Sequence, residues 1–207
     1  MPDPLLVFDT NILLDVWLGR DNDQAVLLVR LAEDHRVELV VPEYVLVEFR
    51  GTALRWVRDE RDRLNNAVRR AANEWVRSQE LGGPAEDIRV AATAIEAKLG
   101  QLSSQVDVVV ARISSVARVP KHTHDVHFRG DLRYLSGRPP DRPVDGLKDC
   151  RIYEALLEVA LADQATMRPK FLVTRDSDFD VKELVDELTT HGFVIRKDPG
   201  RLYGELK

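Results

Sequence analysis

Four short, mainly apolar segments near the two ends of the chain predict strands. They are residues 5–8, 37–41, 171–174 and 193–195. The run at 5–8 is unbroken by polar residues, which is typical of a strand buried on both faces, as in a parallel sheet. Amphipathic patterns at 21–35 and 181–192 predict helices beside these strands, and Pro42 predicts a helix that begins directly after the second strand. The alternation of strand and helix predicts an α/β fold with a parallel sheet.

The long middle of the chain carries two heptad-like apolar series and no segment that predicts a strand. The first series occupies positions 54, 57, 61, 64, 68, 71 and 75, and the second occupies positions 88, 92, 95, 99, 102, 106, 109, 113 and 116. Arg61 is the only polar member of either series, and Leu-Gly-Gly-Pro at 81–84 is a stop and turn signal between them. We therefore expect an antiparallel helical hairpin over 52–118, inserted within a single domain that spans 1–207. Two ordinary core helices are the alternative.

The expected hairpin turns at 82–84 and has one apolar seam. In this seam, Leu64, Val68, Ala71 and Trp75 of the first helix face Ile95, Leu99 and Leu102 of the second. The other faces of the first helix are rich in arginine, which favours a solvated surface, an RNA-binding extension or a docking face for a second subunit. A homodimer is therefore one expected assembly.

Composition narrows the class of protein. The chain has 207 residues, is 44% hydrophobic and carries a net charge of −5, which excludes a globally basic nucleic-acid coat but not a local basic patch. The single cysteine, Cys150, excludes a disulfide framework and a structural zinc site built from several thiolates. No apolar run is long enough to cross a bilayer, and Asp9 and Asp15 interrupt the N-terminal segment where a signal peptide would be apolar. These features predict a cytoplasmic protein without a membrane partner.

Five acidic residues stand where an α/β fold would bring them to one edge. Asp9, Asp176 and Asp178 follow strand ends, whereas Glu48 and Asp149 lie near helix starts. Each has a local alternative, such as a turn or a helix cap. Carboxylates gathered without a cation would repel one another, and clustered oxygen ligands suit Mg²⁺ or Mn²⁺ rather than zinc. A cation held there would activate water and neutralise a phosphoryl oxygen.

The acidic segments together resemble the four acidic motifs of the PIN domain, a metal-dependent nuclease fold. They are FDTN at 8–11, the glutamate of VEF at 48, KD at 148–149 and TRDSDF at 174–179, and the resemblance covers residues 3–51 and 143–197. It implies a three-layer α/β/α sandwich with a central parallel sheet, and hydrolysis of RNA phosphodiesters. It also implies that Mg²⁺ or Mn²⁺ is held by Asp9, Glu48, Asp149 and the pair Asp176 and Asp178, of which Asp9, Glu48, Asp149 and Asp176 are the catalytic acids. Thr10, Asn11 and Thr174 match the polar positions that support these acids.

Two features depart from the compact bacterial members, which include toxins controlled by antitoxins. In those members the last motif is Thr-x-Asn-x-x-Asp-Phe. Here the spacing is one residue shorter, and Asp176 stands in place of the asparagine, as in the Asp-x-Asp of the related flap nucleases. The separation between Glu48 and Asp149 is also much longer, because the hairpin lies between them. A toxin with an antitoxin partner and a flap-type DNA nuclease therefore both stay open.

Residues 118–151 form a basic segment directly before and around the third acidic motif. Its lysines and arginines are Arg118, Lys121, Arg129, Arg133, Arg138, Arg142, Lys148 and Arg151. They are interleaved with His122, His124, His127, Phe128 and Tyr134. Basic and aromatic side chains together grip single-stranded nucleic acid, so we expect Lys148, Arg151, Arg129 and Arg133 to contact RNA. A solvated, proline-rich loop is the alternative, and chelation of a metal by the histidines is a weaker one.

The expected function is that of a Mg²⁺- or Mn²⁺-dependent endoribonuclease. A PIN-like scaffold that binds RNA or protein without strong nuclease activity is the non-enzymatic alternative. A phosphatase with Asp9 as nucleophile is disfavoured, because Asn11 stands where that chemistry needs a second acid. The sequence also lacks the glycine-rich phosphate loops of nucleotide-binding folds and the nucleophile motif of serine hydrolases.

Overall fold

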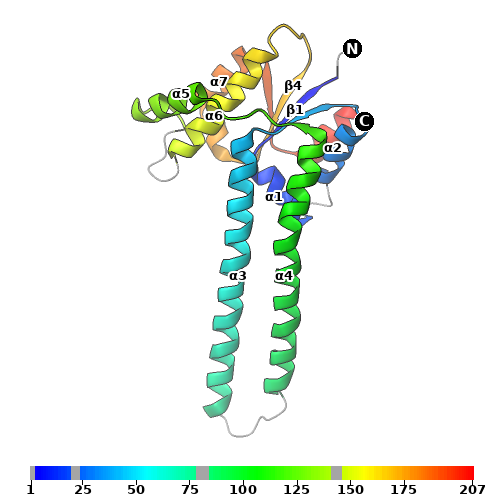
Figure 1. Ribbon diagram of the computed structural model, residues 1–207, viewed down its shortest axis with the longest axis vertical. Helices are drawn as coiled ribbons and strands as arrows, with labels where there is room; N and C mark the ends of the chain where they lie inside the picture. Colours follow the sequence, from blue (N-terminus) through cyan, green and yellow to red (C-terminus); the bar gives the residue numbers. More distant parts are fainter. Residues whose placement is uncertain (1–2, 20–23, 78–83, 141–145) are drawn as a thin grey trace. The chain divides into compact units, whose positions relative to one another are not determined.

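The computed structural model describes residues 3–19, 24–77, 84–140 and 146–207, with the side chains of 72–86 left out (Figure 1). Within these residues the chain divides into two compact units. The first, called the sheet unit, comprises the segments up to Phe49 and from Val109 onward. The second, called the arm unit, runs from Arg50 to Val108. The turn expected at 82–84 and the side chain of Trp75 lie outside the described residues.

The sheet unit is built on a parallel sheet of five strands in the order β3-β2-β1-β4-β5. The strands are β1 (Leu5–Phe8), β2 (Glu38–Val40), β3 (Ala117–Arg118), β4 (Lys170–Val173) and β5 (Phe193–Arg196). β1 and β4 are buried at every position, which explains their unbroken apolar runs. The expectation of no strand in the middle of the chain is wrong, because Ala117 and Arg118 pair with Leu39 and Val40. Two residues are too short a segment to carry an apolar pattern.

Five of the helices correspond to those expected from the sequence, and the others were not expected. They are α1 (Thr10–Leu18), α2 (Gln24–Glu33), α3 (Glu43–Arg77), α4 (Pro84–Val116), α5 (His124–Leu135), α6 (Gly146–Ala162), α7 (Lys182–Thr190) and α8 (Pro199–Leu206), with a 3₁₀ turn, η2 (Ser177–Asp180). α1 is buried on most sides and so lacks an amphipathic pattern. α5 occupies much of the basic segment that the sequence favoured as a nucleic-acid surface or a loop.

Helices cover both faces of the sheet, giving the expected α/β/α layers. Leu5 and Val7 of β1 share one buried cluster with Leu156 of α6 and with Leu184 and Leu188 of α7. Because successive side chains of a strand point to opposite faces, Leu6 and Phe8 of β1, which are also fully buried, face the other side of the sheet. Figure 1 shows α1 and α2 on the other side of the sheet, where α2 also packs against α8. No described helix combines the length and the apolar character that crossing a bilayer requires.

The arm unit contains the two long stretches of α3 and α4, which run in opposite directions (Figure 1). Arg50 pairs with Asp107 at 3.1 Å and Arg61 with Glu96 at 2.5 Å, so residues further along α3 meet residues earlier along α4. The buried seam contains Ala53, Val57, Leu99 and Val106, with Leu64, Val68, Ala71 and Leu102 half-buried. The hairpin is therefore antiparallel, as its repeat predicts.

Two members of the predicted seam lie outside it. Leu54 is 41% exposed and Ile95 is 47% exposed, whereas Ala53 is fully buried and Glu96 reaches Arg61. Neighbouring residues of an α-helix differ by about 100° around its axis, so a strict heptad pattern drifts relative to a straight helix. The expectation that Ile95 faces the first helix is therefore wrong.

Candidate functional site

The sheet has a topological switch point between β1 and β4. From β1 the chain moves to β2 and β3 on one side, whereas β4 and β5 lie on the other side. In parallel α/β sheets ligands bind at such a switch point, outside the carboxyl ends of the strands, because the two connections leave in opposite directions. Asp9 and Thr174 directly follow these two strands, and the Asp9 amide donates to the Val173 carbonyl at 3.2 Å. The first and last acidic motifs therefore meet at the switch point.

Asp9 is held by hydrogen bonds on both of its carboxylate oxygens. Its Oδ1 accepts from the Thr10 amide at 2.7 Å and caps α1. Its Oδ2 accepts from the Thr174 hydroxyl at 2.7 Å and from Nδ2 of Asn11 at 2.9 Å. Only 8% of the residue is exposed. The cap that the sequence offered as a local alternative is thus present, and it fixes the carboxylate at the edge of the sheet.

Glu48 joins this site through Thr10 and Lys148. The Thr10 hydroxyl donates to Glu48 Oε2 at 2.5 Å, and the Lys148 ammonium lies 2.7 Å from Glu48 Oε1. Thr10 is in α1, Glu48 in α3 and Lys148 in α6. These two contacts bring three helices that are distant in the sequence to one side chain.

Asp176 and Asp178 are arranged by Thr174 and by one another. The Thr174 hydroxyl, which donates to Asp9, accepts from the Asp176 amide at 3.0 Å. Asp176 Oδ1 in turn accepts from the Asp178 amide at 2.9 Å and caps η2. Lys197 donates to the Asp176 carbonyl. Thr174 therefore links the side chain of Asp9 to the backbone that carries both later acids.

Asp149 lies in the first turn of α6, beside the lysine that contacts Glu48. Its Oδ1 is 4.0 Å from the Lys148 ammonium, and its side chain is 25% exposed. Lys148 thus stands between the acids of the second and third motifs. The four motifs come to the same edge of the sheet unit, with Lys148 connecting two of them.

Burial and like charges raise the pKa of Asp9 to about 6. Desolvation of the buried carboxylate is the largest cause, and the negative charges of Glu48 and Asp176 add to it. The hydrogen bonds from Thr174 and Thr10 act in the opposite direction and favour the ionised form. Asp9 therefore lies in a region where a further positive charge would stabilise its carboxylate.

The donors at this edge have the chemistry of a site for a hard divalent cation. They are carboxylate, hydroxyl and amide oxygens, which are hard ligands. In the part of the chain that the structure describes, however, no three His, Cys, Asp or Glu side chains are grouped closely enough to share one ion. The ammonium of Lys148 balances Glu48 instead.

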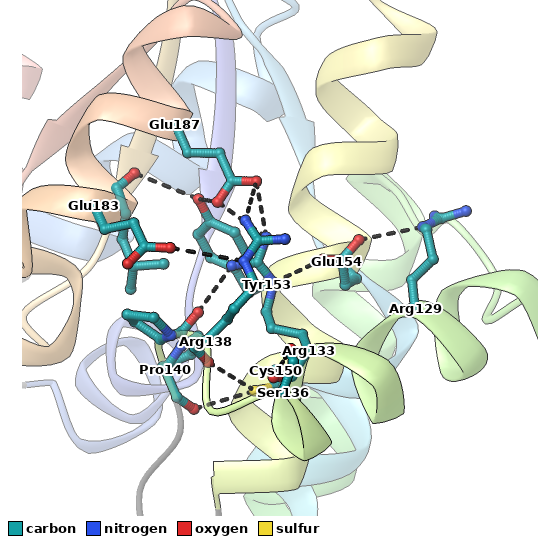
Figure 2. Close-up of polar contacts among 12 residues, drawn as sticks. Arg129, Arg133, Ser136, Arg138, Pro140, Cys150, Tyr153, Glu154, Glu183 and Glu187 are labelled. Carbon is teal, nitrogen blue, oxygen red and sulfur yellow. Dashed lines mark hydrogen bonds and ion pairs between the residues drawn. The ribbon is translucent and has the colours of Figure 1, made fainter.

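Arg133 is buried, which corrects the expectation that it contacts nucleic acid. Only 3% of it is exposed, because α5 turns this face toward the core (Figure 2). Its Nε donates to Glu154 at 2.7 Å and its Nη2 to Glu187 at 2.8 and 2.9 Å. The guanidinium also lies over the Tyr153 ring, 4.4 Å from its centre. Arg133 thus fastens α5 to α6 and α7.

The other three expected RNA contacts stay predictions. Arg129 is partly exposed and pairs with Glu158 at 2.6 Å and Glu154 at 3.2 Å (Figure 2). Arg151 donates to Asp131 at 2.7 Å, and Lys148 faces the acids. Of the four basic residues, Lys148 and Arg151 lie beside the acidic motifs, whereas Arg129 points along the outer side of α6.

Two further contacts support this edge and were not predicted from the sequence. Arg175 donates its amide to Asn11 Oδ1 at 3.1 Å and places its Nε 3.2 Å from the buried carboxylate of Asp15. Tyr44, one turn before Glu48 in α3, contacts Arg151. The placement of Asp15 among apolar residues was the available signal, but the pairing across the sheet edge depends on the fold.

Comparison with known families agrees with this geometry. A family model described as a PIN domain matches residues 6–179, which is most of the chain and includes the arm unit. Neither the curated proteins nor the solved structures contain a match to the sequence. The family match, together with the parallel sheet and its switch point, shows that the chain belongs to the PIN domain family.

Proposed function

We propose that this protein is a Mg²⁺- or Mn²⁺-dependent endoribonuclease that acts on single-stranded RNA. PIN domains are usually nucleases, which gives the general class of reaction. The observation that carries the proposal is the environment of Asp9, a buried carboxylate at the sheet switch point whose pKa is raised by burial and by Glu48 and Asp176. A carboxylate with a perturbed pKa at the switch point of a sheet favours a role in chemistry, because such shifts cluster at functional sites.

Asp9, Glu48, Asp149 and Asp176 would hold the cation, with Asp178 as a further candidate. When bound, the cation supplies an activated water and neutralises charge on the phosphodiester. The Thr10 and Thr174 hydroxyls fix the Glu48 and Asp9 carboxylates in orientation. Because these hydrogen bonds already orient the carboxylates, less side-chain freedom is lost when the acids act together.

Lys148 has two roles in this proposal. In the described arrangement its ammonium neutralises Glu48 at 2.7 Å. A lysine carries a compact charge on a flexible stem, so Lys148 is able to turn from Glu48 to the phosphate of a bound substrate. It would then hold the scissile diester at the acidic edge, where the carboxylates alone would repel it.

The test is cleavage of a fluorescent single-stranded RNA by the full chain with Mn²⁺, compared with DNA of the same sequence. Asp9→Asn and Glu48→Gln should each reduce cleavage by at least about a hundredfold, since each removes a charge that acts on the reacting groups. Asp186→Asn is the matched control, because Asp186 is an exposed acid of α7 paired with Lys182. It should cleave like the parent.

Three results would contradict parts of the proposal. Activity that persists in excess EDTA would remove the metal mechanism. Full activity of Asp9→Asn would remove the role of this carboxylate. Preferential cleavage of the DNA would favour the flap-nuclease alternative, and no cleavage of either strand with intact RNA binding would favour the scaffold.

A further inference from the structure

A cluster of aromatic rings lies one helical turn from the acidic edge. Tyr44 of α3 contacts His122, with ring centres 3.4 Å apart, and His127 of α5, with ring centres 5.3 Å apart. The rings of His122 and His127 are 5.1 Å apart. The Tyr44 hydroxyl and His127 Nδ1 are 3.2 Å apart, within hydrogen-bond distance. Two segments that are far apart in the sequence, around Tyr44 and around His122 and His127, thus form one group of rings.

Arg151 adds a positive charge to this cluster. Its Nη1 donates to the Tyr44 hydroxyl at 3.2 Å, and its Nε donates to Asp131 Oδ1 at 2.7 Å. A guanidinium has five N–H donors. These two hydrogen bonds therefore hold the group in place while other donors can reach a phosphate oxygen.

Two contacts between α3 and α6 connect the cluster to the acids. Tyr44 and Glu48 are four residues apart in α3, and Lys148 and Arg151 are three residues apart in α6, so each pair lies on one face of its helix. Tyr44 meets Arg151, and Glu48 meets Lys148 at 2.7 Å. The ring contacts therefore lie about one helical turn along α3 and α6 from the contact between Glu48 and Lys148.

Close packing of α5 on α6 makes this arrangement possible. A Cβ added to Gly130 would lie 2.6 Å from Cγ and 2.8 Å from Cα of Arg151. Only glycine allows so close an approach, which brings His127 and Asp131 of α5 to the side of Arg151. The contact thus sets the distance between the rings and the guanidinium.

The cluster is partly exposed to solvent and combines aromatic rings with a positively charged guanidinium. Tyr44, His122 and His127 are half-buried, and the Arg151 side chain is 25% exposed. Burial, with the nearby charges of His127 and Arg151, lowers the pKa of His122 to about 4, although Glu43 acts in the opposite direction. The His122 ring is therefore neutral near pH 7.

We propose that Tyr44, His127 and Arg151 form a subsite for the nucleotide next to the scissile phosphate of a single-stranded RNA. The rings stack against its base, and Arg151 donates to its phosphate. Stacking on aromatic side chains with an arginine nearby is the common way to hold an unpaired base. This inference rests on the proposed function for the position of the scissile phosphate, and it adds the residues that hold the neighbouring nucleotide.

The test separates the subsite from the acidic edge by using two substrates. The full chain is assayed with Mn²⁺ on a fluorescent RNA octanucleotide and on bis(p-nitrophenyl) phosphate, a diester without a nucleotide. His127→Ala and Arg151→Gln should each raise KM for the RNA about tenfold, because each removes one contact of the order known for single bases. Both variants should lose several-fold less activity on the small diester than on the RNA, because the small diester has no base to stack. Arg201→Gln is the charge-matched control, since Arg201 is an exposed residue of α8, and it should leave both substrates unaffected.

A binding assay in EDTA separates failure of this inference from failure of the proposed function. Fluorescence anisotropy measures how tightly each protein binds the RNA when no cleavage takes place. A parent that binds RNA but hydrolyses neither substrate would contradict the nuclease proposal, while weaker binding by the two variants would still support the subsite. Unchanged RNA binding and KM in both variants would overturn the subsite. An equal loss on both substrates would overturn it as well, because the residues would then act on the acidic edge itself.

Photocrosslinking of the unmutated chain gives a second measurement that does not depend on the folding of a variant. RNA carrying 5-iodouridine should crosslink to peptides that contain Tyr44, His122 or His127. Tyr44→Phe should keep RNA binding within about threefold, since it retains the ring. Crosslinks confined to the arm unit, at 50–108, would overturn the subsite.

Discussion

The two units of this protein satisfy their charged groups in different ways. In the sheet unit, Arg133 is buried between two glutamates, and Arg168 pairs with the buried Asp163 at 2.6 Å. Among the described residues of the arm unit, the ion pairs are exposed, as for Arg50 and Asp107, whose side chains are 58% and 68% exposed. Buried charges need partners that are fixed by the fold, whereas exposed charges exchange partners with water at little cost. The unit that carries the acidic site is thus the one in which losing a single charge has large effects.

The units also differ in the range of their contacts. The arm unit repeats one pattern along two helices, so each seam residue meets neighbours that the repeat predicts. The acidic site joins residues of the first, second, third and fourth motifs through hydrogen bonds between distant segments, such as that from Thr174 to Asp9. Local repetition makes a structure predictable, but it brings together few different functional groups.

The largest expected difference between the units concerns Arg133. Arg133→Met should lower the free energy of unfolding by about 3–5 kcal/mol, because the buried Glu154 and the half-buried Glu187 would lose their buried counter-charge. Urea denaturation of both proteins at pH 7 measures this effect. Arg129→Met is the matched control, since Arg129 also pairs with Glu154 but is 41% exposed, and it should cost no more than about 1 kcal/mol. Equal losses in the two variants would show that burial is not what makes the Arg133 contacts strong.

The next effect is the pH dependence that Asp9 gives to the sheet unit. The folded pKa of Asp9 is raised to about 6, so the native state keeps a proton that the unfolded state releases near pH 4. Asp9 therefore costs stability progressively as pH rises from about 4 to above 6. In EDTA, Asp9→Asn should become more stable relative to the parent over this range, by on the order of 2 kcal/mol.

Thermal or urea unfolding of both proteins at pH 4.5, 6 and 7.5 provides the measurement. The quantity to compare is how the difference in free energy of unfolding between Asp9→Asn and the parent changes with pH. The altered hydrogen bonds of the asparagine contribute equally to this difference at each pH. Asp186→Asn, at an exposed position, should show no such trend. A constant difference between Asp9→Asn and the parent would mean that Asp9 ionises normally in the fold.

The smallest effect is expected for the ion pair that links the two helices of the arm unit. Arg61 and Glu96 are 2.5 Å apart, with side chains that are 41% and 44% exposed. A double-mutant cycle with Arg61→Ala and Glu96→Ala should give a coupling of about 0.2–1 kcal/mol, and less in high salt. A coupling as large as the loss in Arg133→Met would remove the contrast between the units.

Much of the fold follows from the sequence because its signals are local. The mainly apolar segments predict β1, β2, β4 and β5, and the repeats predict the two long helices. The sequence motifs also place Asp9, Thr10, Asn11 and Thr174 at one edge, where they share hydrogen bonds. β3 escaped prediction, because pairing with β2 rather than an apolar pattern defines its two residues.

The sequence by itself determined the acidic residues of the site and indicated their family. Both the identity of each acid and its position relative to a predicted strand or helix can be read from the sequence. Only the tertiary structure decided which basic residues have partners in the core. Arg133 and Arg151 look alike in one basic segment, yet the first is enclosed by Glu154 and Glu187 and the second lies beside Tyr44. The physical reason is that burial depends on how α5 turns against α6, which Gly130 permits through contact with a residue of another helix.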